Sequence, residues 1–280
     1  MFRSFLLIFC ILSLGLSNLS VGEGIADPSN DPKKSGLQWK WAMESLDRFP
    51  FDEADKVLDL GCRSGSITAE ISARVPSGIV IGVEIPEMMH AKEHYSVSNV
   101  IYIRADAKNL PFVEQFDKAT ALLCFNWIRE QDLALKSLYR ALKPGGKALI
   151  TRPGKQPSNL GPIAQSLIQT GRWAAYFPSY EQKRVYYDAD EYRALLEEAG
   201  FVIEKMGEDS TYTYFKDREA LIGFFRPLCA FADHLSEDLK MQFVENVVDK
   251  VLEFDLPSAD GSIQLHDFKL EAIVSKPSTR

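Results

Sequence analysis

The sequence has few of the residues from which metal centres and disulfide frameworks are built. It contains four cysteines and four histidines among its 280 residues. Apart from Cys10, the cysteines are odd in number and widely spaced, which matches neither a disulfide framework nor a zinc site; they are Cys62, Cys124 and Cys229. His90 and His94 lie four residues apart without a third ligand nearby, so we expect no metal.

A surplus of basic residues is also missing. The chain has 32 lysines and arginines against 39 acidic residues, a net charge of −7. This balance argues against a general nucleic-acid binder, and we expect no nucleic-acid partner. A content of 46% apolar and 25% charged residues is typical of a globular protein. The length suits one domain with a cap, or two small domains.

The first residues form a segment with its own character. A weakly positive start at Met1–Arg3 precedes an apolar run, Phe5–Leu16, and a small-x-small site comes directly before Asp27. This order is typical of a secretory signal peptide, and the run is too short to span a bilayer comfortably. We therefore predict a signal peptide over 1–26 and a polar, proline-containing linker over 27–36.

Alternatives to this leader stay open. The apolar run could be a hydrophobic N-terminal helix of the fold, or the start could be misassigned. Export would also favour paired cysteines, which the chain does not provide. We expect the secretory pathway or periplasm if the leader is real, with membrane contact through the leader only, and the cytoplasm otherwise.

From Lys56 onward, short apolar runs alternate with helical patterns. Near-continuous apolar runs bounded by Gly, Pro or Asp are typical of parallel strands buried on both faces. The predicted strands are Val57–Leu60, Ile79–Val83, Val100–Ile103, Ala119–Cys124 and Ala148–Ile150. Helical patterns precede or separate them at Leu37–Phe49, Ile67–Val75 and Leu133–Leu142. This alternation predicts an α/β fold with a parallel sheet and right-handed crossovers.

After Thr151 the pattern changes. An irregular segment over 152–187 is rich in proline, glycine and aromatic residues, and two amphipathic helices are predicted at 218–235 and 236–254, the first kinked by Pro227. The remaining predicted elements are a helix at 190–199 and strands at 201–215 and 263–275. We predict a single domain over 37–280 with cap insertions at about 152–187 and 216–256.

The turn after the first predicted strand carries the clearest binding signal. A buried strand runs into Gly61-Cys62-Arg63-Ser64-Gly65, and a helix follows. Glycine lets the backbone approach a ligand closely, and a helix N-terminus offers free N–H groups to an anion. Taken alone, such a turn is weak evidence for a ligand.

Two acidic residues strengthen this interpretation. Glu84 ends the second strand, 19 residues after Gly65, where a carboxylate can accept both ribose hydroxyls. Asp106 follows the third strand, where it suits the exocyclic amine of adenine, although a plain helix N-cap is the alternative. An NAD-dependent oxidoreductase is a weaker possibility, because the turn reads Gly-x-Arg-x-Gly rather than Gly-x-Gly-x-x-Gly.

Four motifs in order give the chain its resemblance to class I methyltransferases that use S-adenosylmethionine (SAM), over roughly residues 37–275. The motifs are Val57–Cys62, Gly82–Met89, Asp106–Phe112 and Leu142–Lys147. The chain looks nearest to the trans-aconitate and juvenile-hormone-acid methyltransferase type. The segment Leu37-Gln38-Trp39, before the first strand, also resembles that group. The resemblance implies a Rossmann-like three-layer sandwich, with a seven-stranded, mostly parallel sheet whose last strand is antiparallel, and a helical cap.

The resemblance also implies a set of residues that hold SAM. In this sequence they are Gln38, Asp59, Gly61, Cys62, Arg63, Gly65, Glu84, Ile85, Met88, Asp106, Ala107 and Cys124. Two positions depart from the family pattern. Arg63 replaces the middle glycine of the first motif, and it either pairs with the SAM carboxylate or blocks the site. Asn126 stands where the family often has histidine, and it can hydrogen-bond but is no general base.

These features favour a SAM-dependent methyltransferase acting on a small acidic molecule, at a carboxylate oxygen that needs no base at neutral pH. The substrate is expected near Trp39, Arg152 and Arg172, and the positioning candidates are Phe125, Asn126 and Trp127. The other hypothesis is an exported, degenerate protein that keeps the fold as a binding module without catalysis. The sequence indicates no oligomeric state.

Overall fold

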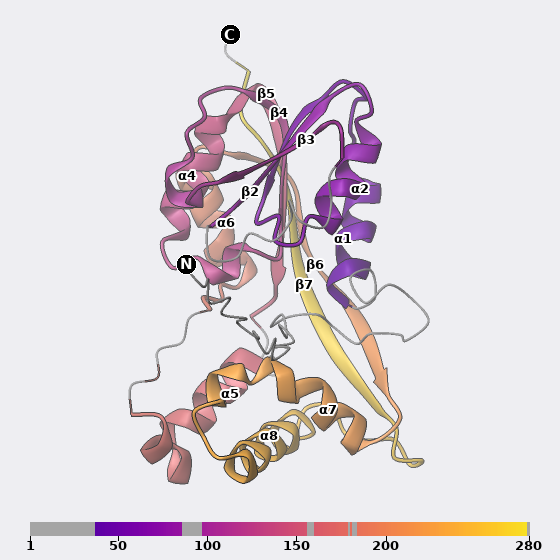
Figure 1. Cartoon of the computed structure of the whole chain (residues 1–280), viewed down its shortest axis with the longest axis vertical. Coiled ribbons are helices and arrows are strands. Elements are labelled where there is room, and N and C mark those ends of the chain that lie inside the picture. Colours follow the sequence, from indigo (N-terminus) through magenta and orange to yellow (C-terminus); the bar gives the residue numbers. More distant parts are fainter. Residues whose placement is uncertain (1–36, 86–96, 156–159, 179, 181–183, 279–280) are drawn as a thin grey trace, which may run out of the picture.

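The computed structural model describes residues 37–85, 97–155, 160–178, 180 and 184–278. The predicted signal peptide and linker, Met88, His90 and His94 lie outside the described residues. In the described part, a twisted sheet separates two layers of helices, and a second group of helices lies beyond one end of the sheet (Figure 1). Among the described helices, none is long and apolar enough to cross a membrane.

Seven strands form one sheet in the order β3-β2-β1-β4-β5-β7-β6. Strand β7 is antiparallel to both of its neighbours, and the pairs among β1 to β5 are parallel. The strands are β1 (Lys56–Leu60), β2 (Ile79–Glu84), β3 (Val100–Arg104), β4 (Phe116–Leu122), β5 (Leu142–Pro153), β6 (Val202–Phe215) and β7 (Ile263–Ser275). The predicted fold class, including the antiparallel last strand, is confirmed.

Helices cover the two faces of this sheet (Figure 1). On one face lie α1 (Leu37–Arg48) and α2 (Ser66–Arg74), and on the other lie α4 (Gln131–Ala141) and α6 (Ala189–Glu198). Because β5 is buried on both faces, Leu149 packs under α1 and α2, while Ile150 packs under α4 and α6. The strand order reverses between β1 and β4, which is where open α/β sheets bind ligands.

A second apolar core lies where β6 and β7 extend past the other strands (Figure 1). Phe215 and Ile263, paired at the far end of this hairpin, are buried against α5 (Leu160–Gln169), α7 (Arg218–Leu228) and α8 (Glu237–Val251). The short 3₁₀ helix η4 (Gly171–Tyr176) adds Trp173 to this core. These helices therefore stand on the β6–β7 hairpin at one end of the sheet.

Helix α7 differs from its prediction. The sequence predicted a kinked helix over 218–235, but α7 ends at Leu228 and a separate 3₁₀ turn, η5 (Ala230–Ala232), follows. Pro227 has no N–H to donate to the carbonyl four residues earlier, which weakens the last turn of the helix. The helix accordingly ends one residue after this proline.

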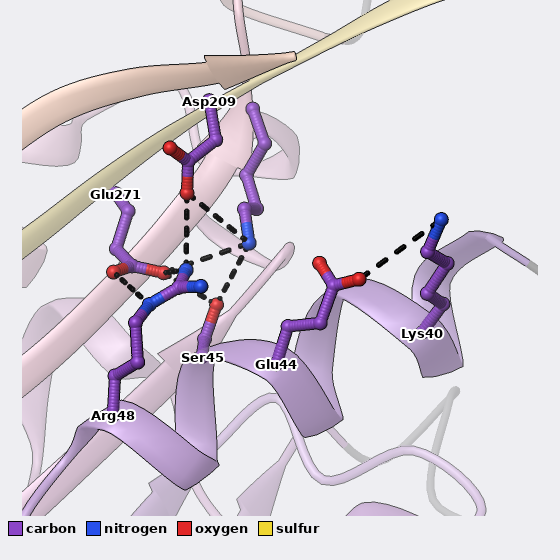
Figure 2. Close-up of polar contacts among 7 residues, drawn as sticks. Lys40, Glu44, Ser45, Arg48, Asp209 and Glu271 are labelled. Atoms are coloured by element: carbon purple, nitrogen blue, oxygen red, sulfur yellow. Dashed lines mark hydrogen bonds and ion pairs between the residues drawn. The ribbon is translucent and has the colours of Figure 1, made fainter. Parts of the chain in front are cut away.

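A network of charged and polar side chains ties α1 to the β6–β7 hairpin (Figure 2). Glu271 accepts hydrogen bonds from Ser45 (2.6 Å) and Arg48 (2.7 Å), and Arg48 also pairs with Asp209 (3.0 Å). Lys269, which is 1% exposed, donates to Ser45 Oγ (3.0 Å) and lies 3.5 Å from Glu271. Burial raises the pKa of Glu271, but the hydrogen bonds from Arg48 and Ser45 outweigh it, and the pKa is lowered. This network fixes the position of the first helix.

Candidate functional site

The turn after β1 is built by two glycines in the left-handed region, Gly61 (φ +82°) and Gly65 (φ +84°). A Cβ on Gly61 would lie 2.5 Å from the Cβ of Cys124, so the close approach of the two segments also demands glycine there. The N–H groups of Gly61 and Cys62 both donate to the carbonyl of Val83, at 2.8 and 3.1 Å. The turn is therefore held rigidly between the ends of β2 and β4.

Asp59 lies directly below this turn and is almost completely buried. One carboxylate oxygen accepts a hydrogen bond from Thr68 (2.6 Å) and the other from Thr120 (2.8 Å). Burial raises the pKa of Asp59 to about 6, although both hydroxyl donors oppose the shift. Because Thr68 lies in the first turn of α2 and Thr120 lies in β4, Asp59 connects the helix after the turn with two strands, and so supports the predicted site.

Glu84 lies at the end of β2 beside the turn. Its two carboxylate oxygens accept the N–H of Arg63 (3.2 Å) and of Ile85 (2.9 Å). Burial raises its pKa, and the two N–H donors and the positive charge of Arg63 counteract the rise. A carboxylate oxygen can accept more than one hydrogen bond, so Glu84 can take two hydroxyl donors as well, which fits the ribose of a nucleoside cofactor.

Arg63 adopts a backbone conformation that glycine favours, with φ of +44°. Its charge lowers the pKa of Glu84, so the guanidinium acts on the carboxylate of the second strand. The sequence offered two positions for this side chain, beside a ligand carboxylate or across the site. The structure adds a backbone contact that the sequence did not suggest, because the N–H of Arg63 donates to the carboxylate of Glu84 (3.2 Å).

Asp106 is exposed at the end of β3 and accepts a hydrogen bond from the N–H of Lys108 (2.9 Å). It caps the short helix η2 (Ala107–Asn109), and Ala107 beside it is buried. The capping alternative is therefore what the structure shows. Its exposed carboxylate still has free acceptor capacity, so a contact to adenine stays a prediction.

The segment after β4 brings together the positioning candidates in the short helix η3 (Phe125–Trp127). Phe125 is completely buried, and Asn126 is 2% exposed with no described partner for its side-chain oxygen Oδ1. Trp127 is 47% exposed, and the guanidinium of Arg184 lies 4.2 Å from its ring centre. Burial holds the pKa of the neighbouring thiol of Cys124 well above its usual value, so this thiol is a neutral group.

The remaining predicted site residues are spread over three elements. Gln38 is exposed and Trp39 half-buried at the start of α1. Arg152 is completely buried at the end of β5. Arg172 lies in η4, where it donates to Gln242 of α8 (3.2 Å) and covers the ring of Trp173. The structure thus brings Arg152 close to η3, but places Arg172 against the second apolar core.

Sequence reasoning missed several residues that shape this site. Tyr102 of β3 donates to the carbonyl of Gly65 (3.4 Å), and its ring would collide with a Cβ on Gly82. Tyr192 of α6 is completely buried with its ring 4.6 Å from the guanidinium carbon of Arg152. A tyrosine within a predicted amphipathic helix carries no signal for such a role. Within the described residues, no three metal-ligating side chains come together.

Comparison with known proteins gives a consistent result. A family model described as a methyltransferase domain matches residues 37–206. The ubiquinone/menaquinone biosynthesis C-methyltransferase UbiE of Vibrio cholerae is 29% identical over 210 residues, which is 66% of this chain and 76% of that protein. UbiE of Vibrio campbellii is 32% identical over 180 residues, 61% and 67% of the two chains. The predicted likeness to the trans-aconitate type is therefore corrected, because these relatives are UbiE C-methyltransferases. The four motifs behind that prediction are ones that the family resemblance assigns to the cofactor, so they do not separate substrate classes.

Solved structures share the fold at low sequence identity. A candidate methyltransferase of Bacillus halodurans C-125 matches with a TM-score of 0.62 and 17% identity, over 85% of this chain and 99% of that chain. Phosphoethanolamine N-methyltransferase 2 of Haemonchus contortus, solved with SAM, matches with a TM-score of 0.54 and 22% identity, over 86% and 53%. The [4+2]-cyclase SpnF matches with a TM-score of 0.55 and 18% identity, over 89% and 85%.

Proposed function

Because this chain belongs to the family of SAM-dependent methyltransferase domains, we propose that it transfers a methyl group to a carboxylate oxygen of a small acidic molecule. SAM supplies the methyl group on a sulfonium that is a good leaving group. The protein then has mainly to position an accepting atom in line and to exclude water.

The observation that carries this proposal is that the described side chains around η3 include no general base. Around η3, burial raises the pKa of the Cys124 thiol and of the Tyr192 hydroxyl, and Asn126 has no basic group. The described histidines lie outside the surroundings of η3. His234 follows η5, and His266 is in the part of β7 that pairs with β6 only. An acceptor that is already ionised at neutral pH is a carboxylate, whereas an alcohol would need deprotonation.

The cofactor residues have distinct proposed roles. Gly61 and Gly65 would let the turn approach the methionine part, and Asp59 would hold that turn from below. Glu84 would accept the ribose hydroxyls, and Asp106 would face the adenine. The fit of Glu84 rests on its position at the carboxyl end of β2, with one backbone donor already on each oxygen.

Two measurements test the proposal on protein that starts at Asp27. Calorimetric titration with SAM and S-adenosylhomocysteine establishes cofactor binding. Transfer of a labelled methyl group is then assayed with a panel of small carboxylic acids, with the matching amides as controls. A methyl ester releases labelled methanol in mild base, so we expect base-labile label with the acids only. Base-stable label would instead indicate transfer to carbon, nitrogen or a hydroxyl oxygen and would overturn the carboxylate assignment.

A non-catalytic binding module is the second candidate function. It is favoured by Arg63, which holds a left-handed backbone position in the first motif where glycine is unstrained. SpnF shares the fold and is named as a cyclase, which illustrates that the fold does not fix the activity. Absence of SAM binding in the titration would favour this alternative.

A further inference from the structure

Arg152 is a buried cation without a counter-ion among the described residues. Its side chain has no exposed surface, and two of its three guanidinium nitrogens, Nε and Nη1, have no hydrogen-bond partner in the described structure. The third, Nη2, donates to the carbonyl of Val185 at 3.1 Å. Buried charges are normally paired or fully hydrogen-bonded, because desolvation of an ion is expensive.

The surroundings of Arg152 compensate this charge only in part. The guanidinium carbon lies 4.6 Å from the ring centre of Tyr192 and 5.2 Å from that of Tyr187, which gives two cation–π contacts. The acidic residue that acts on Arg152 is Glu191, but its carboxylate is already bonded to Lys155 at 2.9 and 3.0 Å. Burial lowers the pKa of Arg152, which is the effect expected for an incompletely compensated cation.

Other unsatisfied polar atoms lie around the same point. The Oδ1 of Asn126 and the hydroxyl of Tyr192 are buried without a described partner. Asn126 and Arg152 meet at Val185, since the Asn126 carbonyl accepts the N–H of Val185 (2.8 Å) while Arg152 donates to its carbonyl. Val185 therefore links η3 to the end of β5, and the ring of Tyr192 from α6 lies against the same guanidinium.

This group of atoms adjoins the predicted cofactor turn. Cys124, which precedes η3, is the residue that a Cβ on Gly61 would strike. Tyr192 belongs to the apolar core against which Cys124 packs, so the two side chains lie in the same part of the molecule. The predicted cofactor turn is thus connected to the end of β5 past the end of β4, through Gly61, Cys124, Tyr192 and Arg152. An acceptor would sit on this side, at the carboxyl ends of the strands.

We propose that Arg152, with the hydroxyl of Tyr192, binds an anionic group of the substrate other than the group that accepts the methyl. The inference rests on the proposed function. A carboxylate held by a guanidinium is a weak nucleophile, and esterification would remove the charge that the arginine binds. The substrate then carries at least two ionised groups, one held by Arg152 and one methylated. A carboxylate and a phosphate share the required chemistry, because both accept hydrogen bonds from a guanidinium.

The test measures anion binding to the protein saturated with S-adenosylhomocysteine. Acetate and inorganic phosphate are titrated at constant ionic strength, with acetamide as the neutral counterpart of acetate, into the wild type and Arg152→Gln. Arg218→Gln is the matched control, because Arg218 of α7 pairs with Asp249 of α8 at the surface and belongs to no predicted site. We expect binding of one anion and not of acetamide, weakened roughly tenfold to a hundredfold by Arg152→Gln and unchanged by Arg218→Gln. The preferred anion distinguishes the two chemistries.

Each failure has its own meaning. A wild type that binds S-adenosylhomocysteine but neither anion would overturn this inference and leave the proposed function standing. A wild type that does not bind S-adenosylhomocysteine would overturn the proposed function itself. A purely structural role for Arg152 would lower the melting temperature of Arg152→Gln and leave its anion affinity unchanged, which also contradicts the inference.

Asn126→Asp keeps the test decisive if Arg152→Gln does not fold. An aspartate at this position would supply an internal counter-ion for Arg152 with the same side-chain shape. We expect this variant to melt at a higher temperature than the wild type and to lose the response to both anions. A variant that keeps the wild-type anion affinity would show that the anion is bound elsewhere.

Discussion

Lys269 and Glu271 lie 3.5 Å apart on β7 and are exposed by only 1% and 5%, so they form a buried ion pair, and both bond to Ser45 of α1. Removing one partner of a buried pair leaves the other charge uncompensated. We expect Glu271→Gln to lower the free energy of unfolding by about 3 kcal/mol, measured by urea denaturation. Glu204→Gln is the control, since Glu204 pairs with Lys147 at the surface, where such a pair contributes less than about 1 kcal/mol.

The lowered pKa of Glu271 gives this pair a pH dependence. A carboxyl whose folded pKa is depressed stabilises the protein above its unfolded pKa, and that stabilisation is lost as the pH falls through the folded pKa. The difference between wild type and Glu271→Gln should therefore shrink at acidic pH. An equal difference at every pH would show that Glu271 acts by packing alone.

Asp59 predicts the opposite pH dependence. Its folded pKa of about 6 lies above the ordinary value, so the folded state binds the proton more tightly than the unfolded state. Its contribution to stability is present below about pH 4 and is lost as the pH rises through about 6. We expect Asp59→Asn to be more stable than the wild type at pH 7.5, by roughly 1–3 kcal/mol, and equal to it near pH 4.

Urea denaturation of both proteins across this range checks the prediction. Asn can still accept from one hydroxyl and donate to the other, so the hydrogen bonds to Thr68 and Thr120 need not be lost. Asp190→Asn, at an exposed position on α6, is the control and should show no such crossover. If Asp59→Asn is instead less stable than the wild type at pH 7.5, the hydrogen bonds that the Asp59 carboxylate accepts contribute more than its burial costs, and the prediction is wrong.

Glu84 should control the affinity for SAM. Loss of charge-assisted hydrogen bonds to the ribose costs about 1.5–3 kcal/mol, so we expect Glu84→Ala to bind SAM roughly tenfold to a hundredfold more weakly. Because burial raises the pKa of Glu84, the wild-type affinity should decline on acidification at a higher pH than for an ordinary glutamate. Calorimetry over a pH series measures both effects, with the exposed Glu197→Gln as control. Unchanged affinity would remove Glu84 from the site.

The sequence was informative where the signal is local. The strand, glycine turn and helix around Gly61, and the acid at the end of β2, are encoded within one βαβ segment and were predicted in place. The partners of Asp59 were not, because Thr68 and Thr120 lie on different elements that only the fold brings together.

The two arginines of the predicted substrate site show the same limit. Arg152 and Arg172 stand in one irregular stretch of sequence, yet one is buried and the other lies on the second core. The difference arises because β5 continues past Ile150 to Pro153, where it pairs with Lys269 of β7 more than a hundred residues away. Long-range pairing of this kind leaves no local pattern in the sequence.

The predicted leader makes a simple prediction about the mature chain. The apolar run Phe5–Leu16 and the small residues before Asp27 favour cleavage after Ala26. N-terminal sequencing or intact-mass measurement of protein from its native source should find a chain that begins at or near Asp27, or one anchored to a membrane. An intact Met1 on a protein of the cytosol would contradict the signal-peptide hypothesis.

Arg63 gives the sharpest test of the cofactor site. Placing a non-glycine residue in the left-handed region destabilises the folded state by about 1–2 kcal/mol. A glycine avoids this strain, but its larger conformational entropy in the unfolded chain cancels part of the benefit. Arg63→Gly should therefore leave the stability unchanged or slightly raised. The charge of Arg63 favours ionised Glu84, so its loss should raise the pKa of Glu84 further.

We accordingly expect Arg63→Gly to bind SAM more weakly than the wild type. The pH below which its affinity for SAM declines should also be higher than in the wild type. Arg63→Lys keeps the positive charge and should retain the wild-type pH profile, although it keeps the backbone strain as well. Calorimetric titration of the three proteins with SAM, from pH 5 to 8, separates charge from backbone. Tighter binding by the glycine variant would mean that the arginine obstructs the site, and it would favour the non-catalytic binding module over the methyltransferase.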